Sequence, residues 1–331
     1  MMQVLLSAPY MLPSVERFLP VFKYYGIELI IAKVNERLEE NDLLNFAGGF
    51  DGAICGDDRY NAKVLSACAP RLKVISKWGT GIDSIDSEAA GRLGIQVRNT
   101  PNAFTLPVAD TVLGYMLAFA RNIPWMDTDI KHGKWIKIPG KSLAEVTLGV
   151  VGVGNIGKAV LTRARGFGMR LMGNDIIEID PVFIRNNQIE MMSLPDLLSQ
   201  SDYVSLNCVL NPTSYHLVNA DALSFMRSTA VLINTARGPV VDEPALIRAL
   251  QIGKIRGAAL DVFEKEPIPA DSPLLKMDNV LLGSHNSNNS SMAWEWVHWN
   301  TIKNLLEGMD IPCDDLEKFR VDSKKLNGGS L

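Results

Sequence analysis

The chain has 331 residues, of which 47% are hydrophobic, and a formal net charge of −4 at pH 7. This length predicts two domains, and the apolar fraction is sufficient for two cores. The weak negative charge and the lack of a basic cluster exclude the charge patterns typical of nucleic-acid binding. The four cysteines and four histidines are scattered without metal-ligand spacing, which predicts no metal site and a reducing, cytoplasmic environment. No apolar run reaches membrane-spanning length, so we expect no membrane partner.

The first hundred residues alternate short apolar runs with helix-compatible segments. We expect strands at residues 4–7, 29–32, 52–55, 74–76 and 95–97, and helices at 15–25, 38–46, 64–67 and 87–93. This alternation predicts a doubly wound parallel sheet. No glycine-rich turn follows the first expected strand. The first half therefore has the architecture of a nucleotide-binding domain without its phosphate-binding sequence.

The second half of the chain continues the α/β pattern. Residues 106–121 predict a long helix that is apolar on every side and therefore buried, as in a connection between domains or a subunit interface. Residues 123–141 contain Trp, Pro and Gly and predict no clear element. We expect strands at residues 147–151, 170–174, 203–206, 230–234, 257–261 and 280–282, and a last helix at 291–306.

A glycine-rich turn with G-x-G-x-x-G spacing lies at residues 150–157, between an expected strand and the helix-compatible run 158–164. Gly152 permits the tight turn, Gly154 lets a pyrophosphate approach the backbone, and Gly157 lets the helix pack against the strand. The phosphates would lie at the helix N-terminus, among unpaired N–H groups. The predicted cofactor-binding residues of this turn are Gly152, Gly154, Asn155, Ile156 and Gly157.

The next expected strand ends at Asp175, which follows Gly157 by 18 residues. This spacing is typical of a carboxylate that binds the adenosine ribose of a dinucleotide. Asp175 would also repel a 2′-phosphate, and residues 176–178 include no Arg or Lys to bind one. The sequence therefore predicts NAD rather than NADP. The alternative is an ordinary glycine turn of an α/β protein.

Three polar residues follow three expected strands: Arg237, Glu266 and His285. The carboxyl ends of parallel strands converge on the ligand crevice, so these residues are expected to meet. Arg237 can bind a carboxylate and polarise the adjacent carbonyl, and His285 can give a proton to the forming alkoxide. Glu266 can orient the imidazole. The alternatives are a surface ion pair for Arg237, a solvated charge for Glu266 and a backbone-bonded loop histidine for His285.

Six segments together resemble the D-isomer-specific 2-hydroxyacid dehydrogenases, most closely the D-3-phosphoglycerate dehydrogenase branch. They are residues 77–86, 99–102, 109–111, the glycine turn, 234–238 and 261–267. The resemblance implies an α/β fold of two doubly wound parallel-sheet domains, in which a Rossmann-like NAD domain is inserted into a flavodoxin-like substrate domain. The implied boundaries are residues 1–104 and 286–313 for the substrate domain, 105–285 for the NAD domain and 314–331 for a polar tail.

The resemblance also implies the activity, which is NAD-dependent interconversion of a D-2-hydroxy acid and its 2-oxo acid, with a phosphorylated acid such as 3-phosphoglycerate as one candidate. It assigns catalysis to Arg237, Glu266 and His285, and adds Thr235, Ala236 and Asp261 to the cofactor site. The implied substrate residues are Lys77, Trp78, Gly79, Thr80, Gly81 and Asn286. Lys77 would face an anionic group or be a solvated lysine. The family is usually dimeric, with a contact in the region of residues 106–141.

The chain departs from the family after His285, where an Asn/Ser-rich run replaces small or apolar residues. This run would either add donors and acceptors to the pocket, the role we assign to Asn286, or cap the final helix through Ser290 and Ser291. Two alternative functions follow. One is oxidation of another small oxyanion, such as phosphite, on the same scaffold, and the other is a non-catalytic, NAD-sensing interaction protein.

Overall fold

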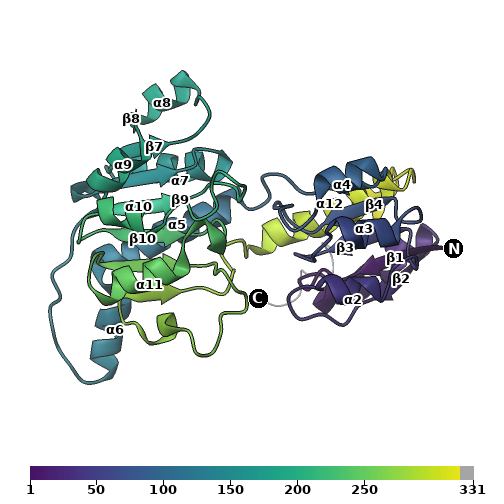
Figure 1. Cartoon of the computed structure of the whole chain (residues 1–331), viewed down its shortest axis with the longest axis horizontal. Helices are drawn as coiled ribbons and strands as arrows, with labels where there is room; N and C mark the ends of the chain where they lie inside the picture. Colours follow the sequence, from purple (N-terminus) through teal and green to yellow (C-terminus); the bar gives the residue numbers. More distant parts are fainter. Residues whose placement is uncertain (321–331) are drawn as a thin grey trace. The chain divides into compact units, whose positions relative to one another are not determined.

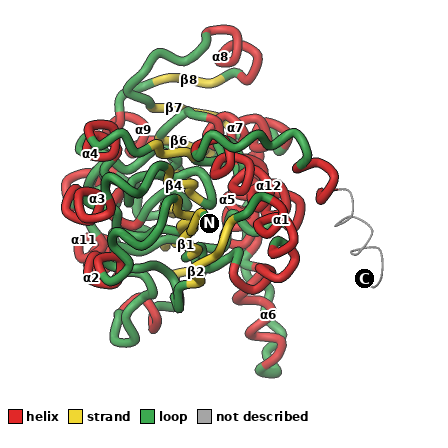
Figure 2. Tube along the Cα trace, turned by 90° about the vertical axis from the view of Figure 1, so that its right-hand side faces the viewer, coloured by secondary structure: helices red, strands yellow, loops and turns green. Residues whose placement is uncertain are grey.

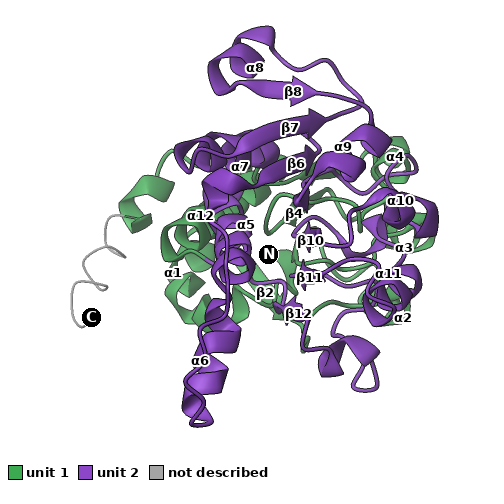
Figure 3. Cartoon of the chain, turned by 90° about the vertical axis from the view of Figure 1, so that its left-hand side faces the viewer, with its two compact units in different colours: residues 1–103, 290–331 green, residues 104–289 purple. Residues whose placement is uncertain are grey.

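The computed structural model describes residues 1–320, which form two compact units (Figure 3). Unit 2 consists of Phe104–Asn289, and unit 1 contains the residues before it and those after it. The predicted insertion of one parallel-sheet unit into another is therefore confirmed. Of the predicted polar tail, residues 321–331 lie outside the described part of the chain. Within the described part, Asp315 accepts a hydrogen bond from the Tyr24 hydroxyl, so this end of the chain packs on unit 1.

Unit 1 is built on a five-stranded parallel sheet with the order β2-β1-β3-β4-β5 (Figure 1). The strands are β1 (Met2–Leu6), β2 (Ile27–Ile31), β3 (Gly52–Cys55), β4 (Val74–Lys77) and β5 (Gln96–Arg98). The helices are η1 (Leu12–Arg17), α1 (Leu19–Tyr24), α2 (Glu40–Leu44), α3 (Ala62–Cys68), α4 (Ser87–Arg92) and α12 (Ser291–Gly308). This strand order is that of flavodoxin-like folds, as the family resemblance implied.

Helix α12 joins the returning chain to the sheet of unit 1. The Ser76 hydroxyl on β4 donates to the Thr301 carbonyl of α12 at 2.7 Å. A Cβ at Gly52 would lie 2.9 Å from Leu305 Cδ1, and a Cβ at Gly308 would overlap Val74. Glycine at both positions lets the helix lie close to β3 and β4.

Unit 2 contains a seven-stranded parallel sheet with the order β12-β11-β10-β9-β6-β7-β8. The strands are β6 (Thr147–Val151), β7 (Arg170–Asn174), β8 (Ile189–Met191), β9 (Tyr203–Leu206), β10 (Val231–Asn234), β11 (Gly257–Leu260) and β12 (Val280–Leu282). The sequence did not predict β8, which extends the sheet beyond β7 (Figure 2). The strand order reverses between β6 and β9, where α/β sheets bind ligands beyond the strand ends.

The helical elements of unit 2 either precede β6 or occupy the connections between the strands. They are α5 (Thr105–Arg121), α6 (Ile123–Lys131), η2 (Leu143–Glu145), α7 (Asn155–Gly166), α8 (Pro181–Asn187), α9 (Leu194–Gln200), α10 (Ala220–Phe225), η3 (Gly238–Val240), α11 (Glu243–Gln251) and η4 (Pro273–Lys276). Within residues 1–320, no helix combines the length and apolar character that crossing a membrane requires.

Two features at the start of unit 2 add to what the sequence indicated. Helix α5 is buried along one face only, because Leu106 is 59% exposed and Asp110 faces outward to form an ion pair with Arg163. The next segment, in which the sequence indicated no clear element, contains the helix α6. The left-handed backbone of Asn122, with φ of 53°, ends α5 and allows α6 to start in a new direction.

A buried carboxyl group joins three parts of unit 1. Asp58 is fully buried, accepts a 2.6 Å hydrogen bond from the Leu38 N–H, and also accepts one from the Ser7 hydroxyl. Burial raises the pKa of Asp58 from 3.8 to about 6, although these two hydrogen bonds act in the opposite direction. The folded protein therefore binds a proton at the Asp58 carboxyl group more tightly than the unfolded chain does.

This shift predicts a pH-dependent stability. The stabilisation is fully present below the unfolded pKa of 3.8 and is lost as the pH rises through about 6. Between pH 4 and 7, the free energy of unfolding should fall by roughly 2 kcal/mol relative to that of Asp58→Asn. Chemical denaturation of both proteins across this range measures the difference. A difference that does not vary with pH would contradict the prediction.

The comparison with Asp58→Asn is needed because the contribution of His298 to the free energy of unfolding changes with pH in the opposite direction over the same pH range. Burial lowers the pKa of His298 from 6.5 to about 4. Its contribution to stability is lost as the pH falls, so it offsets that of Asp58 in the wild-type protein. The difference between the wild type and Asp58→Asn removes the His298 contribution, which both proteins share.

Candidate active site

The glycine turn connects β6 to α7 and has the geometry that phosphate binding requires. Gly152 has a positive φ of 88°, and a Cβ there would collide with the backbone of Cys208. A Cβ at Gly157 would overlap the carbonyl of Gly152. At Gly154, the N-cap of α7, a Cβ would meet no atom within 4 Å, so the backbone is open to a ligand. The turn therefore fits a pyrophosphate at the start of a helix.

Asp175 directly follows β7 and lies beside this turn. Its carboxylate accepts hydrogen bonds from the N–H groups of Val153 at 2.6 Å and Ile177 at 3.2 Å. Ile176 and Ile177 are exposed, and no basic side chain stands next to them in sequence. Asp175 thus places a negative charge at the end of β7 and fixes the backbone of the turn.

Two buried polar atoms near the carboxyl ends of β9 and β10 have no hydrogen-bond partner among residues 1–320. They are Asn207 Oδ1 and Thr235 Oγ1. A buried polar atom without a partner is costly, and a bound ligand that supplies one removes the cost. Together with the open backbone at Gly154, this arrangement fits a dinucleotide that extends along the strand ends.

The structure brings Glu266 and His285 together. Glu266 follows β11 and His285 follows β12, and these strands are neighbours in the sheet. Glu266 Oε2 lies 2.9 Å from His285 Nδ1, and Glu266 Oε1 accepts a 2.9 Å bond from the Phe263 N–H. His285 has a φ of 52°, a value that residues other than glycine adopt infrequently, and its N–H donates to the Asp261 carbonyl at 2.7 Å. The Glu266 carboxylate therefore holds the His285 imidazole in one orientation through Nδ1.

Arg237 follows β10, the next strand in the sheet. The Asn234 side chain shapes this loop, because it donates to the Arg237 carbonyl at 3.0 Å and accepts from the Ala236 N–H at 3.1 Å. A Cβ at Gly238 would overlap the Phe263 carbonyl, so the Arg237 loop lies directly against the loop that leads to Glu266. The three predicted residues thus occupy adjoining loops of unit 2.

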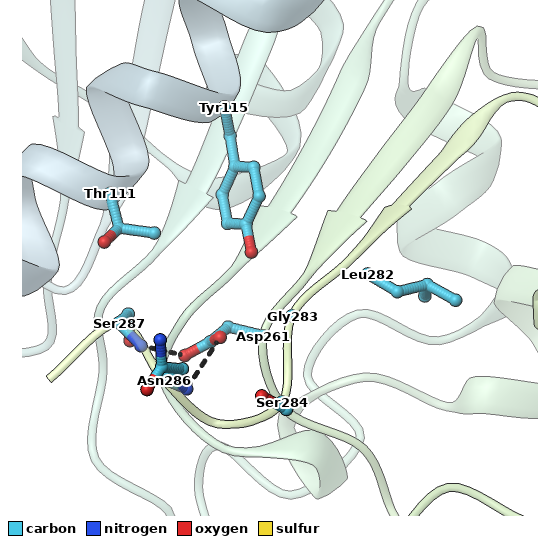
Figure 4. Close-up of a pocket in the computed structure, with 8 residues that line it drawn as sticks. All are labelled: Thr111, Tyr115, Asp261, Leu282, Gly283, Ser284, Asn286 and Ser287. Atoms are coloured by element: carbon cyan, nitrogen blue, oxygen red, sulfur yellow. Dashed lines mark hydrogen bonds between the residues drawn. The ribbon is translucent and has the colours of Figure 1, made fainter. Parts of the chain in front are cut away.

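A pocket of about 420 Å³ adjoins His285 in unit 2 (Figure 4). It is lined by Thr111, Tyr115, Asp261, Leu282, Gly283, Ser284, Asn286 and Ser287. Asp261 is 1% exposed and accepts hydrogen bonds from the backbone N–H groups of Asn286 at 3.0 Å and Ser287 at 2.9 Å. Asp261 therefore anchors the chain immediately after His285.

The sequence analysis did not assign Thr111 and Tyr115 of α5 to the site, although both line the pocket, and the Tyr115 hydroxyl points toward Asp261 (Figure 4). Burial, and secondarily the charge of Asp261, raise the pKa of the Tyr115 hydroxyl to about 12. A Cβ at Gly283 would lie 2.6 Å from this hydroxyl, so the small residue makes room for it. The available signal was that Thr111 and Tyr115 are polar side chains in a mostly apolar helix.

The predicted substrate residues 77–81 lie in unit 1. The Lys77 side chain is only 6% exposed, and its Nζ lies 3.1 Å from Asp57 Oδ1. The alternative of a solvated lysine is therefore wrong. The Trp78 side chain is also buried, and its Nε1 donates to His298 Nδ1 at 2.9 Å. Gly79 has a φ of 117°, and Thr80 donates to the Thr100 carbonyl at 2.9 Å, so the loop has a fixed conformation.

The Asn/Ser run has a different role from helix capping. Ser290 occupies the N-cap position of α12, but its side chain makes no capping hydrogen bond, and Ser291 is already helical. The capping prediction was wrong. Asn286 lines the pocket, and its side-chain oxygen accepts a 2.8 Å bond from the Asn289 side chain.

The sequence profile described as "D-isomer specific 2-hydroxyacid dehydrogenase, NAD binding domain" matches residues 113–287. A glyoxylate reductase from Korarchaeum cryptofilum is 42% identical over 234 residues, which are 69% of this chain and 70% of the relative. A D-3-phosphoglycerate dehydrogenase from Methanocaldococcus jannaschii is 41% identical over 246 residues, which are 72% of this chain but 47% of that protein.

Among solved structures, the D-lactate dehydrogenase from Aquifex aeolicus, in complex with NAD and lactic acid, is similar with a TM-score of 0.81. It is 26% identical, and the match covers 93% of this chain and 97% of that chain. The chain belongs to the D-isomer specific 2-hydroxyacid dehydrogenase family. It is an NAD-dependent oxidoreductase, and the predicted cofactor is confirmed.

The position of Asp175 predicts a change in cofactor binding. We expect Asp175→Ala to weaken NADH binding by about tenfold or more, because charge-assisted hydrogen bonds are lost. The ratio of NADPH to NADH affinity should rise, because the charge that repels a 2′-phosphate is gone. Fluorescence titration measures both, with Glu178→Ala as the control at an exposed acid three residues away. Unchanged NADH affinity in Asp175→Ala would contradict the assignment.

Proposed function

We propose that Arg237, Glu266 and His285 perform the interconversion of a D-2-hydroxy acid and its 2-oxo acid. The observation that carries this proposal is the 2.9 Å contact between Glu266 and His285 at the ends of neighbouring strands in the NAD-binding unit. The Arg237 loop packs against the Glu266 loop. One edge of the sheet therefore supplies a proton-transfer group in His285, a carboxylate that orients it in Glu266, and a cation in Arg237.

Each residue has a definite chemical task in this proposal. Glu266 holds His285 at Nδ1, so Nε2 is the atom that gives the proton to the carbonyl oxygen and takes it back in the reverse direction. The carboxylate also stabilises positive charge on the ring. Arg237 binds the substrate carboxylate and polarises the adjacent carbonyl. The bound nicotinamide supplies or accepts the hydride.

The cofactor and the substrate carboxylate are bound by the remaining predicted residues. The backbone from Gly152 to Gly157, with Asn155 and Ile156, would hold the pyrophosphate, and Asp175 the adenosine ribose. Thr235, Ala236 and Asp261 would line the nicotinamide end, where Thr235 Oγ1 needs a hydrogen-bond partner. In unit 1, the N–H groups of the loop 79–81 would bind the substrate carboxylate, with Lys77 and Trp78 beside it.

We further propose that the substrate is a small 2-oxo acid without a phosphate, such as glyoxylate or hydroxypyruvate. Lys77, the residue assigned to an anionic group, is almost fully buried and forms an ion pair with Asp57, which compensates its charge. Relatives named glyoxylate reductase and hydroxypyruvate reductase are 42% and 35% identical to this chain. Asn286 and Ser284 give the pocket the polar groups that a hydroxylated acid would use.

NADH absorbance with a panel of 2-oxo acids tests the substrate. The panel comprises glyoxylate, hydroxypyruvate, pyruvate and phosphohydroxypyruvate. We expect kcat/KM to be highest for glyoxylate or hydroxypyruvate and at least about tenfold lower for the phosphorylated acid. A preference for phosphohydroxypyruvate would overturn the substrate proposal and leave the catalytic residues in place. Tight NADH binding without turnover of any acid would favour the NAD-sensing alternative.

The catalytic assignment predicts the effect of removing the imidazole. His285→Ala should lower kcat by roughly 10²-fold or more, the scale of lost general acid–base catalysis. NADH affinity should remain unchanged, as measured by fluorescence titration of the same preparation. Near-normal turnover in this variant would exclude His285 as the proton donor.

We also propose that the protein is a cytoplasmic homodimer. Its cysteines are all free thiols, as expected in a reducing compartment. Large apolar side chains are exposed at the region that the family uses as its dimer contact. They are Ile123, Ile130, Trp135 and Ile136, of which Trp135 is 87% exposed. A second copy of the chain would cover this surface.

The dimer proposal predicts that a charge in this region separates the subunits. Trp135→Glu should shift the molar mass in light scattering from that of a dimer toward that of a monomer, because the charge would be desolvated at the contact. Ile252→Glu is the matched control, since Ile252 is 79% exposed on another part of unit 2. A wild-type protein that is monomeric at all concentrations would contradict the proposal.

A further inference from the structure

Unit 2 contains a hydrogen-bonded group that the proposed mechanism does not use. It consists of His216, Glu243 and Glu264, and we call it the His216 brace. His216 Nε2 lies 2.8 Å from Glu264 Oε1, with the two side chains 30% and 31% exposed. Because a carboxylate only accepts hydrogen bonds, Nε2 carries the hydrogen in this contact.

His216 contacts two of the three loops that carry catalytic candidates, those of Arg237 and Glu266. Its main-chain N–H donates to the Pro239 carbonyl at 2.8 Å, and Pro239 lies two residues after Arg237. Its ring contacts Glu264, which lies two residues before Glu266. One residue therefore ties the loop after β10 to the loop after β11.

The Glu264 carboxylate is itself held in place by the start of helix α11. Glu264 Oε1 accepts a 3.1 Å bond from the Glu243 N–H at the start of that helix. In return, the Glu264 N–H donates to Glu243 Oε2 at 3.2 Å. The first N–H groups of a helix have no partner within the helix, so Glu264 satisfies one of them.

The backbone of His216 is held in an uncommon conformation. Its φ is 49°, a region that residues other than glycine rarely adopt, and its ring stacks on Tyr215 with centroids 4.1 Å apart. Such strain persists where the surrounding contacts determine the conformation, and it is common at functional sites. Here it lets the N–H of His216 bond one loop while the ring bonds the other.

We propose that His216 is a positioning residue that fixes the Arg237 loop and the Glu266 loop relative to each other. This inference rests on the proposed function, because that proposal assigns catalytic roles to Arg237 and Glu266 on these two loops. The loops also touch at Gly238, where a Cβ would overlap Phe263, so a shift of one loop displaces the other. A displaced Glu266 holds His285 less well, and a displaced Arg237 misaligns the substrate carboxylate. Small displacements of this kind lower turnover strongly.

The first test compares His216→Ala with His216→Gln. The glutamine amide can replace the Nε2 donor, and Gln188 of this chain already has a φ of 54°. We expect His216→Ala to lower kcat/KM for the 2-oxo acid by about tenfold or more, with the NADH dissociation constant unchanged within about twofold. His216→Gln should recover most of the loss. A residue that only stabilises the fold would lower Tm without changing kcat/KM of the folded enzyme.

The second test asks whether the effect passes through the contact with Glu264. In a double-mutant cycle, His216→Ala and Glu264→Ala should be strongly non-additive, so that the double variant loses little more activity than either single variant. Glu190→Ala is the matched control, because Glu190 in β8 forms a comparable ion pair with Arg170 in β7. It should leave kcat/KM unchanged.

A spectroscopic signal reports directly on the positioning. The chain has only four histidines, so the imidazole N–H of His285 that bonds Glu266 is resolvable by NMR with labelled histidine. We expect this signal to shift or broaden in His216→Ala, and to remain as in the wild type in His216→Gln and Glu190→Ala. Such a change would show that His216 acts on the Glu266–His285 contact.

The outcomes separate this inference from the proposed function. If His216→Ala is folded and has wild-type kcat/KM and an unchanged His285 signal, the positioning role is overturned. Losses that multiply in the double variant would also overturn it, because the contact with Glu264 would not be the route. If His285→Ala keeps near-normal turnover, the proposed function itself fails, whatever the His216 variants show.

Discussion

The parallel register of β10, β11 and β12 is the constraint on which the candidate site depends. In a parallel sheet all strands end at the same edge, so the loops that follow these three strands emerge side by side. Arg237, Glu266 and His285 each follow one of these strands. The 2.9 Å contact between Glu266 and His285 joins residues 19 apart in sequence at adjacent strand ends. Without this register, no local feature of the chain would bring them together.

Contacts to the backbone fix the conformations of these loops. Gly238 lies against the 263–264 peptide because it has no side chain. The buried carboxylate of Asp261 binds two successive N–H groups after His285 and so fixes the strained backbone at that residue. A buried charge is costly unless it is fully hydrogen-bonded, and here the hydrogen bonds that compensate it also build the site. The same hydrogen bonds therefore stabilise this edge of the sheet and position the residues of the candidate site.

Unit 1 uses buried polar groups in a similar way. Lys77 is held by Asp57 and by the carbonyl of Trp78, while Trp78 is held by His298. Asp58 joins the strand that ends near Ser7 to the segment at Leu38. These contacts fix the loop 79–81 from behind. The residues that the family resemblance assigns to the substrate are therefore part of a rigid support, and the open backbone of the loop is the part suited to bind an anion.

The sequence by itself predicted the alternating α/β pattern, the glycine turn with Asp175, and the three strand-end residues. These features are local, because periodicity, turn glycines and residue spacing are set by neighbours in the chain. Strand β8 and helix α6 were missed because they are short or weakly patterned, and their formation depends on packing. Helix α5 looked uniformly apolar in the sequence, but one of its faces is partly exposed.

The tertiary structure alone decided which polar groups are buried and which partners they have. It placed Tyr115 beside Asp261, paired Lys77 with Asp57, and set His216 between two loops that are distant in sequence. None of these contacts leaves a periodic or motif signal, because each depends on how separate connections pack at a sheet edge. The sequence therefore determined the class of chemistry through local patterns. Packing decided how the residues that carry it are held, because hydrogen bonds between distant loops form only once the strands are in register.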